Sequence, residues 1–89
     1  MTETEILQLR TRLGLSQPQF AQLMGVHPMT VSRWERRELS PTPHQVAFMT
    51  AYKKGAEDKK IREEFSAVMI GAGIVAAVLL LLTAAQKGE

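Results

Sequence analysis

The chain has 89 residues, a net charge of +2 and no cysteine. A chain of this length forms one domain with room for one additional element. The lack of cysteine excludes disulfides, thiolate metal sites and a cysteine nucleophile. The net charge indicates nucleic acid only weakly, because it is far from strongly basic. The basic residues nevertheless gather in two groups, which are Arg33, Arg36 and Arg37, and then Lys53, Lys54, Lys59, Lys60 and Arg62.

Apolar spacing and helix-capping residues predict four short helices in the first 55 residues. Ser16 and Thr42 are good N-cap residues, and each is followed by a proline in the first turn. Gly14, Gly25 and Gly55 end the first, second and fourth helices. The predicted spans are about 3–13, 17–24, 28–36 and 43–54. The sequence shows no β-strand alternation, so we expect an all-α fold, a small helical bundle.

The spacing of Ala21, Gly25 and Val31 predicts a helix-turn-helix. Two helices that cross steeply through a short turn need a small residue at the crossing and a branched apolar residue opposite it. Ala21 and Val31 meet these two needs, and Gly25 tolerates a positive φ in the turn. Trp34 falls on the same inward face as Val31. We therefore expect Trp34 in the core rather than as a stacking platform for bases.

Over about residues 5–52 the sequence resembles the Cro/repressor (Xre-type) helix-turn-helix family. The resemblance rests on Leu13-Gly14-Leu15-Ser16-Gln17, Phe20-Ala21, Met24-Gly25-Val26 and Thr30-Val31-Ser32-Arg33-Trp34-Glu35-Arg36. It implies a repressor-like domain that binds double-stranded DNA, and a bacterial or phage transcription regulator rather than an enzyme. The alternative is a protein-interaction module without specific DNA binding, which the modest net charge and the apolar Pro28-Met29 favour.

The resemblance also implies which residues contact DNA. The third helix would lie in the major groove, with base contacts from His27, Pro28, Met29, Ser32 and Arg33. Phosphate contacts would come from Gln17, Thr30, Arg36 and Arg37. Arg33 is the strongest candidate for reading a base, because a guanidinium donates two hydrogen bonds to guanine O6 and N7.

Three further positions concern the fold of this domain. The resemblance implies that Glu35 pairs with Arg10 of the first helix instead of contacting DNA. His27 stands where the family usually has a serine or threonine cap, and Arg37 stands where it usually has a left-handed glycine. These two departures concern how the third helix begins and ends.

No metal site, catalytic centre or cofactor is predicted. His27 and His44 lie seventeen residues apart, without an acid or a cysteine at metal-ligand spacing. The sequence also lacks a nucleophile arranged with its base. It lacks a glycine-rich phosphate loop as well.

The segment Ala67–Ala85 has nineteen residues without a charge and predicts a helix that is apolar on every side. We expect this helix to run unbroken from near Glu57 to about Ala85. Its apolar length matches the hydrocarbon core of a bilayer, and five Lys or Arg residues shortly before it favour an N-terminal domain in the cytoplasm. Two interpretations stay open, an inner-membrane anchor and a helix buried in a soluble oligomer.

Small residues at four-residue spacing predict a face through which two copies of this helix would pack. These residues are Gly71, Ala72, Gly73, Ala76 and Ala77. The sequence therefore divides into a DNA-binding domain, residues 1–55, and a C-terminal helix, residues 56–89, which anchors the protein or assembles it as a homodimer or higher homo-oligomer.

Overall fold

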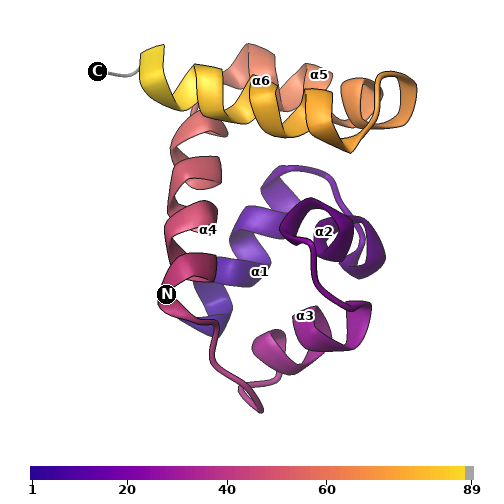
Figure 1. The fold of residues 1–89 in the computed structure, drawn as a ribbon. Helices are drawn as coiled ribbons and strands as arrows, with labels where there is room; N and C mark the ends of the chain where they lie inside the picture. The colour runs from indigo at the N-terminus through magenta and orange to yellow at the C-terminus, as the bar shows by residue number, and fades with distance from the viewer. Residues whose placement is uncertain (88–89) are drawn as a thin grey trace.

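The computed structural model describes residues 1–87 and is helical throughout this range, without strands. Its six helices are α1 (Glu3–Arg12), α2 (Gln17–Met24), α3 (Pro28–Glu35), α4 (Pro43–Gly55), α5 (Lys59–Gly71) and α6 (Ile74–Lys87). Figure 1 shows α1, α2 and α3 gathered beside α4, with α5 and α6 across one end of α4. The all-α class and the four N-terminal helices are confirmed, and Gly55 is the last residue of α4.

Polar side chains cap the helices where the sequence predicts them. At α2 the Gln19 N–H donates to Ser16 Oγ at 3.2 Å, and the Ser16 N–H donates to Gln19 Oε1 at 2.9 Å. Thr42 and Gln45 repeat this reciprocal arrangement at α4. Gly25 ends α2 with a φ of 69°, a left-handed conformation that costs glycine little. These local signals set the boundaries of α2 and α4.

A single hydrophobic core joins the described helices. Its members include Phe20, Val31 and Trp34 from the helix-turn-helix, Met49 from α4 and Leu81 from α6. Trp34 is buried, as its spacing predicts. The core therefore includes residues from both sides of position 55, and α5 and α6 complete it.

The prediction of one unbroken C-terminal helix is wrong. The apolar segment forms two helices, because α5 ends at Gly71 and α6 begins at Ile74. Gly73 lies between them with a φ of 95°, which residues with a side chain rarely adopt and which ends a helix. The chain reverses there, so that α6 lies beside α5 and across α4 (Figure 1). No helix among residues 1–87 is long and apolar enough to cross a bilayer.

The reversal buries one face of α6 against its own chain. Ala77, Leu81 and Ala85 follow one another at four-residue spacing, and all three are buried. The backbones of α4 and α6 come close at Gly55, where a Cβ would lie 3.0 Å from the Leu81 carbonyl carbon. The apolar segment thus packs against other helices of the same chain. Neither the membrane interpretation nor the oligomer interpretation included this arrangement.

The small residues of this segment do not form one continuous stripe, because the helix that would carry them is broken. Gly71, Ala72 and Gly73 lie at the turn between α5 and α6. Ala77 is fully buried inside the chain, and Ala76 is half-buried beside it.

Tyr52 of α4 lies under α6, and its burial has a measurable consequence. Burial raises the pKa of the Tyr52 phenol above its ordinary value of 10.0, because the phenolate is poorly solvated there. The unfolded chain ionises first, so the stabilising contribution is complete below about pH 10 and is lost as the pH rises through the native pKa. Tyr52 is the one tyrosine of the chain, so ultraviolet absorbance during an alkaline titration reports it directly. We expect a higher midpoint in the native protein than in urea, and equal midpoints would contradict the burial of this ring.

Candidate nucleic-acid interface

The crossing of α2 and α3 leaves one face of α3 open to solvent. Val31 and Trp34 point into the core. Met29 and Arg33, four residues apart on the opposite face, are exposed. Of the other predicted contact residues, His27 and Pro28 are exposed at the start of α3, and Thr30 and Ser32 are half-buried at the edges of the open face. The structure therefore places the predicted base-contacting residues at the start of α3 and along one side of it.

The three arginines predicted at this face differ in their partners. Arg36 Nε lies 2.9 Å from Glu38 Oε2, and Arg36 Nη2 lies 3.8 Å from the Met29 sulfur. Arg37 Nε lies 3.6 Å from Glu3 Oε1. The Arg33 guanidinium has no ion pair or hydrogen bond with any residue of the range 1–87. Arg33 can therefore bind a ligand without first losing a protein partner.

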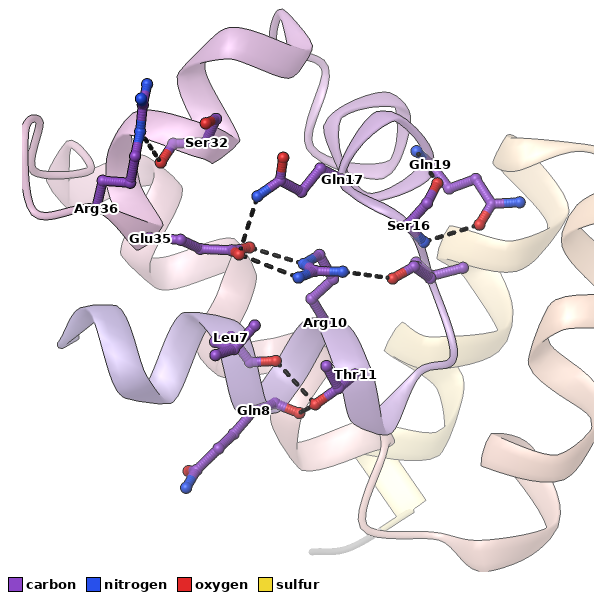
Figure 2. A network of polar contacts seen from close by, with 11 residues as sticks. Leu7, Gln8, Arg10, Thr11, Ser16, Gln17, Gln19, Ser32, Glu35 and Arg36 are labelled. Atoms are coloured by element: carbon purple, nitrogen blue, oxygen red, sulfur yellow. Dashed lines mark hydrogen bonds and ion pairs between the residues drawn. The ribbon is translucent and has the colours of Figure 1, made fainter.

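A largely buried polar network joins α1, α2 and α3 (Figure 2). Arg10 Nε and Nη2 donate to the two carboxylate oxygens of Glu35 at 2.7 and 3.0 Å, which is the bidentate geometry that suits a guanidinium and a carboxylate. Arg10 Nη1 also donates to the Leu15 carbonyl at 2.9 Å. The ion pair expected between Arg10 and Glu35 is thus present, with 16% and 9% of the two side chains exposed.

Gln17 belongs to the same network, a contact that the sequence does not predict. Its amide nitrogen donates to Glu35 Oε1 at 3.1 Å, as Figure 2 shows. This bond ties the first residue of α2 to the last turn of α3, and only one of the two amide hydrogens is used. The partners are 18 residues apart in sequence, so no spacing along a single helix signals the contact.

The N-terminus of α2 keeps one backbone donor open. Gln19 N–H is bonded to Ser16 Oγ, and Pro18 has no N–H. The Gln17 N–H has no acceptor among the described residues. An open N–H at the positive end of a helix dipole is suited to an anion such as a phosphate.

Arg37 keeps the left-handed conformation at the exit of α3, with a φ of 63°. The Glu38 N–H donates to the Arg33 carbonyl at 2.9 Å, and the Arg37 N–H donates to the Trp34 carbonyl at 3.2 Å. These two bonds satisfy the last carbonyls of the helix as a glycine-ended helix does. The arginine therefore leaves the exit of α3 unchanged, at a conformational cost of about 1–2 kcal/mol.

The open face of α3 and its exit combine arginines and hydrogen-bonding side chains with the apolar Pro28 and Met29. Within the described range, no group of three or more His, Asp or Glu residues lies close enough together to hold a metal ion.

Two helices that meet through a glycine turn, with the second exposing a basic face, define a helix-turn-helix DNA-binding fold. Residues 6–49 match the family model described as Helix-turn-helix. Residues 6–49 belong to this family, of the Cro/repressor type that the sequence resembles, and its members are DNA-binding regulatory domains. The matched span covers most of α1, the whole of α2 and α3, and about half of α4. Comparisons with curated proteins and with solved structures found no match.

Proposed function

We propose that this protein is a sequence-specific DNA-binding transcription regulator that reads the major groove with α3. The observation that carries the proposal is the exposed, unpaired guanidinium of Arg33 on the open face of α3. A guanidinium in the major groove donates to guanine O6 and N7. The open N–H of Gln17 supplies a donor for a phosphate, and Glu35 ties Gln17 to α3. A role on DNA puts this domain in the cytoplasm.

In this arrangement some residues contact base edges and others contact phosphates. The base contacts come from His27, Pro28, Met29, Ser32 and Arg33, and the phosphate contacts come from Gln17, Thr30, Arg36 and Arg37. Arg36 and Arg37 would exchange their ion pairs with Glu38 and Glu3 for phosphates. That exchange costs little, because exposed ion pairs contribute at most about 1 kcal/mol.

Replacing Arg33 with alanine should weaken binding to a DNA fragment selected by the wild-type protein by about 1–3 kcal/mol and relax the preference at one base pair. The matched control is Lys60→Ala, which removes one exposed positive charge from α5, far from α3 in Figure 1. Fluorescence anisotropy at several salt concentrations measures both variants. Wild-type affinity should fall steeply as salt rises, because phosphate contacts release counterions.

The Arg33 assignment fails if Arg33→Ala binds with unchanged affinity and specificity while the wild-type protein binds DNA. Binding that is insensitive to salt would instead favour the protein-interaction module, because an apolar contact between proteins releases no condensed counterions.

We further propose that two copies of the chain associate through the surface between α2, α4 and α6. Phe48, Val75 and Leu79 are each more than half exposed there, beside an open groove of about 360 Å³ whose lining residues carry no charge. Interface cores are depleted of charge in the same way. A stable interface takes about 800 Å² from each partner, about a seventh of this chain's 5430 Å². Two copies would also supply two recognition helices, one for each half-site of an operator that has two half-sites.

Replacing Leu79 with glutamate should convert a dimer of this kind to a monomer, because the interface would bury an unpaired carboxylate. Light scattering on the eluting protein measures the molar mass directly. Leu7→Glu is the matched control, since Leu7 is also a partly exposed leucine but lies on α1 outside the groove. A wild-type protein that is monomeric at the highest concentration tested would overturn the association.

A further inference from the structure

The recognition helix α3 begins with a histidine whose side chain is the cap. His27 Nδ1 accepts a hydrogen bond from the Met29 N–H at 3.0 Å. A ring nitrogen that accepts such a bond carries no proton, so the neutral imidazole holds its single proton on Nε2. The cap therefore selects one of the two tautomers of His27.

The first turn of α3 has no backbone N–H left over for a ligand. Pro28 has none to offer. The Met29 N–H is bonded to the His27 ring, and the Thr30 N–H donates to the His27 carbonyl at 2.9 Å. The start of α2 differs, since its Gln17 N–H is open. Apart from the backbone N–H of His27 itself, the donor left at the start of α3 is consequently a side-chain atom, His27 Nε2.

We propose that His27 is a specificity-determining residue that donates its Nε2–H to a hydrogen-bond acceptor on the DNA. The two ring nitrogens point away from each other, so a ring with Nδ1 on the backbone turns Nε2–H outward, and His27 is exposed. The inference rests on the proposed DNA-binding function, and it adds the atom that makes the contact and the direction of the bond.

A neutral donor discriminates between groups in the major groove. Purine N7, guanine O6 and thymine O4 accept a hydrogen bond, whereas the amino groups of adenine and cytosine donate one and are not matched. A phosphate oxygen also accepts, and it would use the same atom to set the register of α3. A serine or threonine cap keeps its short hydroxyl close to the helix backbone, so the longer imidazole extends the reach of this position.

The tautomer is tested on the free protein, independently of DNA. A long-range proton–nitrogen NMR correlation of isotope-labelled protein assigns the protonated nitrogen of each histidine. We expect the Nε2–H form alone for neutral His27. His44 is exposed and has no hydrogen-bond partner among the described residues, so it serves as the unrestrained reference. A proton on Nδ1 of His27, or a mixture like that of His44, overturns the inference.

The contact itself is tested with His27→Ser, which keeps a capping oxygen but loses the outward donor. Its affinity for a DNA fragment selected by the wild-type protein should fall about three- to tenfold, with an unchanged melting temperature. His44→Ser should bind as the wild-type protein does. If His27→Ser melts early, His27→Thr replaces it, because its short hydroxyl also caps a helix and stays close to the backbone. Unchanged affinity in the well-folded variant overturns the inference.

Modified DNA identifies the acceptor. Bases that lack N7, O6 or O4 are placed one at a time in the selected fragment. Neutral methylphosphonate linkages are placed in the same way. One such change should weaken DNA binding by the wild-type protein while leaving binding by His27→Ser unaffected. Its position identifies the acceptor as a base or a phosphate. If no position distinguishes the two proteins, the proposed contact is overturned. Arg33→Ala separates this failure from a failure of the proposed function, because it weakens binding whether or not His27 touches DNA.

Discussion

Replacing Glu35 with alanine should lower the free energy of unfolding by about 3 kcal/mol, because it leaves a largely buried cation without its partner. The Arg10 guanidinium would lose two hydrogen bonds and the Gln17 amide would lose its acceptor. For a domain of this size the melting temperature should fall by roughly 12–24 °C. Thermal and urea unfolding followed by circular dichroism measure the change.

Two further variants test whether the loss of stability comes from the burial of this ion pair. Glu38→Ala removes the partner of Arg36 from an ion pair of nearly the same length, 2.9 Å against 2.7 Å, with both side chains more than half exposed. Its effect should stay below about 0.5 kcal/mol. Arg10→Met combined with Glu35→Leu should recover much of the lost stability, because apolar residues of similar volume need no partner. If Glu35→Ala cost no more than Glu38→Ala, the network would not be holding α1, α2 and α3 together.

DNA binding should weaken in the Glu35 variant as well. Glu35 holds the Gln17 side chain and thereby the start of α2 relative to α3. When this restraint is removed, the Gln17 N–H and Arg33 no longer keep a fixed separation, and part of the binding free energy goes into ordering them again. The measurement is affinity at a temperature where the variant is still folded.

Replacing Gly55 with alanine should destabilise the protein by about 1–3 kcal/mol, although alanine is favoured over glycine within a helix by about 1 kcal/mol. The added Cβ would lie 3.0 Å from the Leu81 carbonyl carbon and would contact the carbonyl oxygen still more closely. The obstacle is backbone, so no rotamer change relieves it, and α6 must move away from α4. Urea unfolding measures the loss. The Tyr52 phenol should also titrate nearer its ordinary value as the cover of α6 loosens.

Gly71→Ala is the matched control for this variant. Gly71 is also the last residue of its helix, and a Cβ there meets nothing within 4 Å. This change should be neutral or stabilising by up to about 1 kcal/mol. A Gly55→Ala protein as stable as the wild type would show that the close crossing of α4 and α6 is absent in solution.

The helix-turn-helix could be predicted because its signals are local. The reciprocal cap of Ser16 and Gln19, the turn at Gly25 and the packing pair Ala21 and Val31 all lie within sixteen residues. Each signal acts over one turn of helix or one crossing, so the residue types alone were sufficient. The family resemblance added the pairing of Arg10 with Glu35, whose members are 25 residues apart.

The candidate site could be predicted only as a set of residues. The sequence places Arg33, Arg36 and Arg37 together, but it does not tell which guanidinium is unpaired. That distinction depends on Glu38 and Glu3, and the latter reaches Arg37 from α1. The role of His27 as a cap likewise depends on the side chain reaching the Met29 N–H, a matter of rotamer and not of spacing.

By itself the sequence determined the four N-terminal helices, the family and the face of α3 that meets solvent, because capping, turn and packing preferences all agreed there. Only the tertiary structure decided the arrangement of the apolar segment. Leu81 is buried and Leu79 is exposed, yet both are leucines in a run without polar residues, so periodicity has no contrast to detect. Gly73 and Gly55 are visible in the sequence as glycines. Their roles, a reversal at a positive φ and a close backbone crossing, exist only once α6 packs on α4.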